Sequence, residues 1–105
     1  MEGFVFKYNG DCYFLESTRK NRNNADAQII LQYICYKLGK NLTLKELIKE
    51  HEFIKKHMFW AKIEYDFEHV RELENETEMH YFYTIYKKDG DFEYIDEEDF
   101  VIINK

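Results

Sequence analysis

One cysteine, one histidine and one aspartate carry the side chains that a thiol-based catalytic site would need. Cys12 follows Gly10 and Asp11, and His80 and Asp99 are candidates for the base and for the acid that orients it. A nucleophilic cysteine requires a stabilised thiolate, most often at a helix N-terminus beside a histidine that a third group holds in place. The chemistry available to this trio is that of a thiol hydrolase.

Two short segments resemble papain-like peptidases such as calpains. Residues 10–15, GDCYFL, are similar to the segment that carries the nucleophile in that family. Residues 80–96, HYFYTIYKKDGDFEYID, are similar to the strand, hairpin and acid that carry the family's histidine. The resemblance implies a papain-like thiol hydrolase that uses Cys12 and His80. The chain lacks the glutamine that the family has upstream of its cysteine.

The sequence around Cys12 predicts a strand instead of a helix N-terminus. Apolar residues alternate along residues 4–15 on both sides of Asn9-Gly10, the dipeptide most typical of a two-residue type I′ turn. Such a turn pairs Tyr8 with Asp11 and leaves the cysteine in mid-strand. A thiol at that position cannot use a helix dipole to stabilise its thiolate.

A second turn, predicted at Asp89-Gly90, bears on the same triad. A two-residue turn there pairs Tyr83 with Asp96 and His80 with Asp99. Asp96, the acid expected from the resemblance, then falls on the wrong side of the strand, and only a triad with Asp99 remains. We therefore expect a protein that is not an enzyme, with the thiol hydrolase as the alternative.

Charge is separated along the chain. Residues 1–58 contain 10 Lys and Arg against 7 Asp and Glu, whereas residues 59–105 contain 5 against 14, so the two parts carry net charges of +3 and −9. Carboxylates with few cations nearby repel one another and attract basic surfaces. Interspersed tyrosines and Trp60 would add the contact area that interfaces prefer. The predicted partner-binding residues are Glu72, Glu74, Glu76, Glu78, Asp89, Asp91, Glu93, Asp96, Glu97, Glu98, Asp99 and Trp60.

Other ligand classes have weaker support. No metal or cofactor site is expected, because the four histidines and two cysteines have no spacing that brings ligands together. Residues 2–8, EGFVFKY, share their aromatic spacing with the RNA-stacking strand of RNA-recognition domains, and Arg19, Lys20 and Arg22 form a basic cluster. Aromatic strands more often belong to a core, so we expect no direct nucleic-acid contact and keep an RNA- or DNA-binding regulator as a second alternative.

Two helices are predicted after the first hairpin. The first covers residues 25–38, with an asparagine N-cap at position 23 or 24 and a stop at Gly39. The second begins at a capping box formed by Thr43 and Glu46. Because the first helix is apolar almost all round, and residues 79–87 are apolar on both faces, the chain is also compatible with a homodimer.

Beyond the helices the period of the apolar residues changes to two. We predict a half-buried strand at 61–68, a polar loop at 72–78, a central strand at 79–87, and further strands at 91–95 and 100–103. The chain is therefore predicted to be one α+β domain over residues 1–105. Its antiparallel sheet of about five strands would pack on a helical hairpin in the order ββααβββ(β).

Composition completes the functional expectation. The sequence has no membrane-length apolar run, no export signal and only two cysteines, so we expect a cytoplasmic protein without membrane contact. A Lys-, Asn-, Ile-, Tyr- and Phe-rich chain without proline is associated with phages and mobile elements of A- and T-rich hosts. We expect a small acidic protein that binds a basic protein partner in the host cytoplasm. Its predicted role is stoichiometric inhibition of a nucleic-acid-binding or nuclease system in an anti-defence setting, with its acids imitating a nucleic acid.

Overall fold

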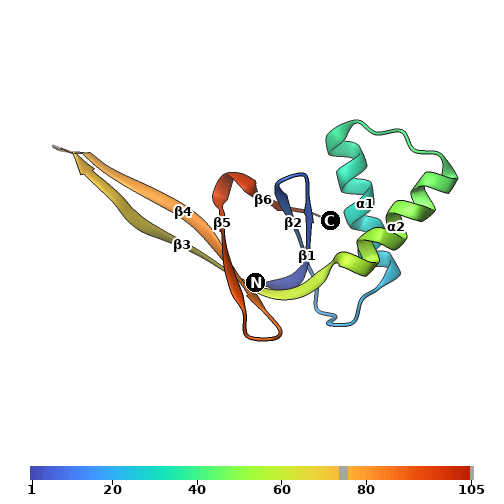
Figure 1. Cartoon of the computed structure of the whole chain (residues 1–105), viewed down its shortest axis with the longest axis horizontal. Helices are drawn as coiled ribbons and strands as arrows, with labels where there is room; N and C mark the ends of the chain where they lie inside the picture. Colours follow the sequence, from blue (N-terminus) through green and yellow to red (C-terminus); the bar gives the residue numbers. More distant parts are fainter. Residues whose placement is uncertain (74–75, 105) are drawn as a thin grey trace.

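The structure is a computed structural model that describes residues 1–73 and 76–104, with side chains described outside 69–77, and it confirms the α+β class (Figure 1). Its elements run in the order strand, strand, helix, helix and four strands, with a short 3-10 turn before the last strand. The elements are β1 (Glu2–Tyr8), β2 (Asp11–Glu16), α1 (Asn24–Leu38), α2 (Leu44–His57), β3 (Phe59–Leu73), β4 (Glu76–Lys87), β5 (Phe92–Asp96), η1 (Glu97–Asp99) and β6 (Phe100–Ile102).

The strands form one sheet in the order β5-β4-β3-β1-β2-β6. Neighbouring strands are antiparallel except for β2 and β6, which are parallel. The parallel pair departs from the purely antiparallel sheet that we predicted. It arises because the chain crosses from β5 at one edge to β6 at the other, so no hairpin turn dictates the direction of β6.

Apolar side chains are buried on both faces of the sheet. On one face β1 and β2 pack against the two helices, with Phe4, Tyr13, Leu15, Ile30 and Ile54 in the core. On the other face a smaller core contains Val5, Cys12, Phe14, Ala61, Ile63, Ile85 and Phe100. The helices therefore cover only the β1–β2 end of the sheet, and β3, β4 and β5 extend beyond them (Figure 1).

The β1–β2 hairpin has the predicted register and turn. Tyr8 lies opposite Asp11 and Phe6 opposite Tyr13. Asn9 and Gly10 have φ values of 49° and 82°, which is the pair of positive angles that a type I′ turn requires. Cys12 is accordingly the second residue of β2, in the strand that the turn predicts and not at a helix N-terminus.

Both helices begin at predicted caps, and α1 ends at the predicted glycine. The Asn23 side chain accepts a hydrogen bond from the Ala25 amide at the start of α1, and Gly39 closes that helix in the left-handed conformation. Thr43 and Glu46 form the predicted capping box at the start of α2.

The turn between β4 and β5 is one residue longer than predicted. The Lys87 amide donates to the Asp91 carbonyl at 2.8 Å, so three residues separate the paired positions, and Gly90 takes a φ of 94°. A three-residue loop with glycine in the left-handed region is the next most common hairpin connection after the two-residue turn. Tyr83 therefore faces Ile95 instead of Asp96, and each side chain of β5 lies on the face opposite to the one predicted.

The polar loop predicted at residues 72–78 is wrong for the residues that the structure describes. β3 and β4 continue as a long hairpin, and Leu73 still pairs with Glu76. Glutamates at every second position fit a solvated strand as well as a loop, since the pleat directs alternate side chains to opposite faces. The hairpin projects from the body as an arm, and the whole molecule measures 57 × 32 × 20 Å (Figure 1).

Candidate functional site

An uncovered surface of β3, β4 and β5 brings aromatic rings and carboxylates together. It lies on the helix-facing side of the sheet, because Trp60 packs towards the helices and every second residue after it in β3 points the same way. The strand register aligns these residues in rows across the three strands. We call this surface the acid–aromatic face; its residues are Lys62, Glu64, Asp66, Glu68, His80, Phe82, Thr84, Tyr86, Phe92, Tyr94 and Asp96.

The rings on this face support one another while they remain in contact with solvent. Tyr94 lies 5.2 Å from Phe82 and 5.6 Å from Phe92 between ring centroids, both edge to face. Tyr86 lies 6.3 Å from Phe92. Tyr94 is nevertheless 65% exposed and Phe92 56% exposed, whereas Thr84, in the same row as Tyr94, is buried. The result is a solvent-facing surface of aromatic rings that contact one another.

Carboxylates surround the rings and bond to them or to a histidine. The Tyr86 hydroxyl donates to Glu64 at 3.3 Å. Desolvation, together with the negative charge of Glu64, raises the pKa of Tyr86. His80 lies between Glu68, 3.1 Å from its Nδ1, and Asp96, 2.6 Å from its Nε2. Hydrogen bonds to these two carboxylates raise the pKa of His80 above its ordinary value.

The His80 contact makes this face sensitive to pH. Because the folded-state pKa is raised above the ordinary value of 6.5, the contact is stabilising below pH 6.5 and is lost as the pH rises through the folded-state pKa. We expect an NMR titration of the His80 ring to give a midpoint above 6.5, and Asp96→Asn to move that midpoint down. A midpoint that Asp96→Asn leaves unchanged would contradict this assignment.

Of the predicted partner-binding acids, Asp96 belongs to the acid–aromatic face, and Glu78 lies two residues before His80 on the same side of β4. Glu93 points to the opposite face, where it forms an ion pair with Lys7. Glu97 accepts a hydrogen bond from the Tyr65 hydroxyl at 2.9 Å. The remaining acids are distributed over the turn, η1 and the arm: Asp89, Asp91, Glu98 and Asp99 are exposed, Glu72 and Glu76 lie in strands without described side chains, and Glu74 lies outside the described residues.

Trp60 is not part of this face. Its ring packs edge to face on Phe4 at 5.4 Å and belongs to the rim of the helix-side core. Conversely, sequence reasoning missed Glu64, Asp66 and Glu68 as site residues. Their alternation with apolar residues was visible in the sequence, but it did not show that the side of the strand they occupy is uncovered.

The residues of the thiol-hydrolase alternative are not brought together in the described part of the chain. The Cys12 side chain is 2% exposed in the core on the side away from the helices, and burial raises the pKa of its thiol to about 12. His80 bonds to Glu68 and Asp96, and Asp99 lies in η1. Asp96 thus reaches the histidine, as the resemblance implied, but the pair contacts no thiol among the described residues.

Burial of the aromatic residues in β1 counts against the nucleic-acid alternative. Phe4 and Phe6, from the strand that resembled an RNA-stacking strand, are at most 2% exposed and have no face free for a base. Within residues 1–73 and 76–104, no group of three potential metal ligands was found. Among these residues, no helix is long and apolar enough to cross a membrane.

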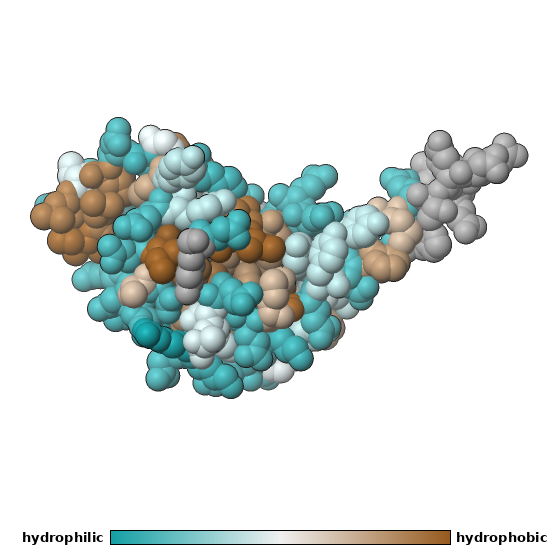
Figure 2. All heavy atoms as spheres, turned by 180° about the vertical axis from the view of Figure 1, so that it is seen from behind, coloured by the Kyte–Doolittle hydropathy of each residue, from teal (hydrophilic) through white to brown (hydrophobic). Residues whose placement is uncertain are grey.

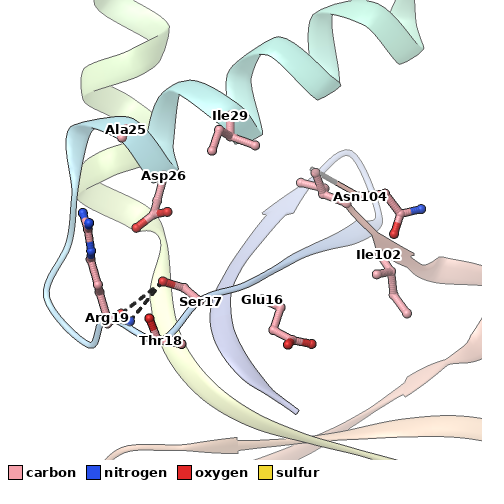
Figure 3. A pocket seen from close by; sticks show the side chains of 10 residues that line it. Glu16, Ser17, Thr18, Arg19, Ala25, Asp26, Ile29, Ile102 and Asn104 are labelled. Atoms are coloured by element: carbon pink, nitrogen blue, oxygen red, sulfur yellow. Dashed lines mark hydrogen bonds between the residues drawn. The ribbon is translucent and has the colours of Figure 1, made fainter.

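A cavity of about 610 Å³ lies between the start of α1, the segment after β2 and the C-terminal segment (Figure 3). Asp26 points into it from α1 and is buried, and its Oδ2 has no hydrogen-bond partner among the described residues. Ser17 on the opposite wall is engaged with the backbone of Arg19. Asp26 lies in the first turn of α1, where the positive end of the helix dipole favours an acidic residue.

An apolar patch covers part of the helical hairpin (Figure 2). Leu44 and Ile48 of α2 are 74% and 55% exposed. Leu31 and Cys35 of α1 lie across a groove of about 480 Å³ from Ile48. Part of α1, one of the two segments from which a homodimer was predicted, lines this groove; the exposed apolar residues of the patch, Leu44 and Ile48, lie on α2.

Comparisons of the chain with protein-family models, with curated proteins and with solved structures found no match.

Proposed function

We propose that this chain is a non-enzymatic protein-binding module whose acid–aromatic face docks onto a basic protein surface. The observation that carries the proposal is the exposed, mutually packed cluster of Phe92, Tyr94 and Tyr86 among carboxylates, on a sheet surface that no described helix covers. Aromatic side chains have only two rotatable χ angles, so they supply apolar contact area at low entropic cost, and tyrosine is enriched at the centre of interfaces. The acids supply electrostatic complementarity and speed association with a basic partner.

The consequence of such docking depends on what the basic surface normally binds. A surface that binds nucleic acid holds phosphates through Lys and Arg side chains. The carboxylates of Glu64, Asp66 and Asp96 would occupy that surface in place of phosphates. Stoichiometric inhibition of a nucleic-acid-binding or nuclease partner is therefore the role that we propose, in the cytoplasm of a phage- or mobile-element-bearing host.

A single ring on the face provides the test. We expect Tyr94→Ala to weaken binding to the captured partner by about tenfold or more, because truncation of an exposed interface tyrosine removes a large contact while leaving the core intact. Tyr36→Ala is the matched control, since Tyr36 is also an exposed tyrosine, at 87%, but lies on α1. The tagged chain and both variants are used to capture proteins from a host lysate at low and high salt, and affinities are then measured with the purified partner.

The expected pattern is a partner that is lost at high salt, lost with Tyr94→Ala and retained with Tyr36→Ala. Equal affinities of the two variants would show that the partner uses another surface. Retention at high salt would remove the electrostatic part of the proposal.

A further inference from the structure

A second cavity, of about 350 Å³, gathers cations that are far apart in the sequence. Lys20 and Arg22 come from the loop before α1, and Lys87 and Lys88 come from the end of β4 and the turn after it. We call this cavity the basic pocket. The sequence places Lys20 and Arg22 in a basic cluster, but only the fold adds the two lysines from the opposite half of the chain.

The cations of the basic pocket are only partly neutralised by the protein. Arg22 is fixed by a hydrogen bond of 2.8 Å from its Nη1 to the Lys56 carbonyl. Lys87 lies 4.0 Å from Glu93, which also pairs with Lys7. Lys20 and Lys88 form no ion pair with any residue whose side chain is described, and Asp89 is the one carboxylate on the wall. Four cations thus lie beside two acids, Asp89 and Glu93, which leaves the basic pocket with a net positive charge in a protein of net charge −6 and favours the binding of an anion.

Aromatic side chains form the rest of the wall. Phe59 and Trp60 line the basic pocket, and both are half-buried. The Trp60 ring is held at 85° to that of Phe4, and the Lys87 ammonium lies 5.6 Å from the centre of the Phe59 ring. Aromatic rings of this kind stack on nucleobases, and each stacked base contributes about 1–3 kcal/mol by alanine substitution.

We propose that the basic pocket binds a mononucleotide. Lys20, Arg22 and Lys88 would hold its phosphates through charge-assisted hydrogen bonds, and Trp60 would contact its base. The volume of the pocket lies within the range of small-molecule sites, which is about 300–1,000 Å³. The pocket is distinct from the acid–aromatic face in composition and in sign of charge, so this site does not depend on the function proposed above.

Trp60 is the only tryptophan of the chain, so its fluorescence reports on the basic pocket directly. The full chain is titrated separately with ATP, adenosine, inorganic pyrophosphate and a short single-stranded RNA without a terminal phosphate. We expect ATP to change the Trp60 fluorescence in a saturable way. The affinity for adenosine, which lacks the phosphates, and for pyrophosphate, which lacks the base, should be about tenfold or more weaker. No saturable change with ATP up to millimolar concentration overturns the proposal. Equal affinity for pyrophosphate, or tighter binding of the RNA, overturns it in favour of a plain anion site or a strand-binding site.

Charge variants complete the test. Lys20→Gln with Lys88→Gln is expected to weaken ATP binding by about tenfold or more, while the unfolding midpoint stays unchanged because both side chains are exposed. Lys45→Gln with Lys49→Gln removes the same charge from α2 and is expected to leave the affinity unchanged. Equal losses of ATP affinity in the two double variants would show that ATP responds to the overall charge of the protein, and would overturn the assignment of the site.

Discussion

Gly3→Ala is expected to lower the free energy of unfolding by about 3 kcal/mol, a large part of the total stability of a domain of this size. A Cβ atom at position 3 would lie 2.1 Å from the Leu15 carbonyl oxygen and 2.8 Å from the Glu16 Cα. Both obstacles are backbone atoms of β2, so no flexible side chain can move away. β1 pairs with β2 on one side and β3 on the other, and a shift of one strand would disturb both pairings.

Urea unfolding followed by circular dichroism measures this loss. Glu2→Ala is the matched control, because Glu2 is the exposed neighbour of Gly3 in the same strand and its substitution is expected to change the stability by about 0.5 kcal/mol or less. If the free energy of unfolding of Gly3→Ala equalled that of Glu2→Ala, β1 and β2 could not approach as closely at this point as the structure shows.

Cys12 is expected to be almost unreactive in the folded protein. Burial raises the pKa of its thiol from 9.0 to about 12, which lowers the thiolate fraction at neutral pH on the order of a thousandfold. The variant Cys35→Ala leaves Cys12 as the sole thiol. Its reaction with a disulfide reagent should be slow until urea unfolds the chain and fast afterwards.

Cys12→Ala is the complementary variant, since it leaves only the half-buried Cys35. We expect its thiol to react faster than that of the Cys35→Ala variant in the folded state. Rapid reaction of Cys12 in the folded chain would contradict its burial and would return the thiol hydrolase to the leading position among the alternatives.

Features encoded within a few neighbouring residues were predicted correctly from the sequence. The turn at Asn9-Gly10 needs two residues that tolerate positive φ, and the capping box of Thr43 and Glu46 needs two side chains three residues apart. The length of the β4–β5 turn could not be predicted from neighbouring residues, because an Asp-Gly pair fits both a two-residue and a three-residue loop. One residue of difference reversed the faces of β5 and brought Asp96 to His80.

The candidate site was only partly predictable for a related reason. The acidic character of the C-terminal half was visible in the composition, and Asp96 was named among the acids. Which face of β3 remains uncovered depends on where the helices pack, and that is a long-range property of the fold. The sequence therefore predicted the dense acidic run at Asp96–Asp99 as part of the binding surface. In the structure, rings and acids are instead gathered on β3, β4 and β5.

Acids on the acid–aromatic face are expected to steer a basic partner towards this surface. The most direct measurement is the association rate of the purified partner as a function of salt for two double variants. Glu64→Gln with Asp66→Asn removes two charges from the face, and Glu50→Gln with Glu52→Gln removes two from α2. We predict that the first pair slows association and flattens its salt dependence, while the second pair leaves both close to those of the unmodified chain. Equal association rates for the two pairs at every salt concentration would show that the acids of the acid–aromatic face do not steer the partner.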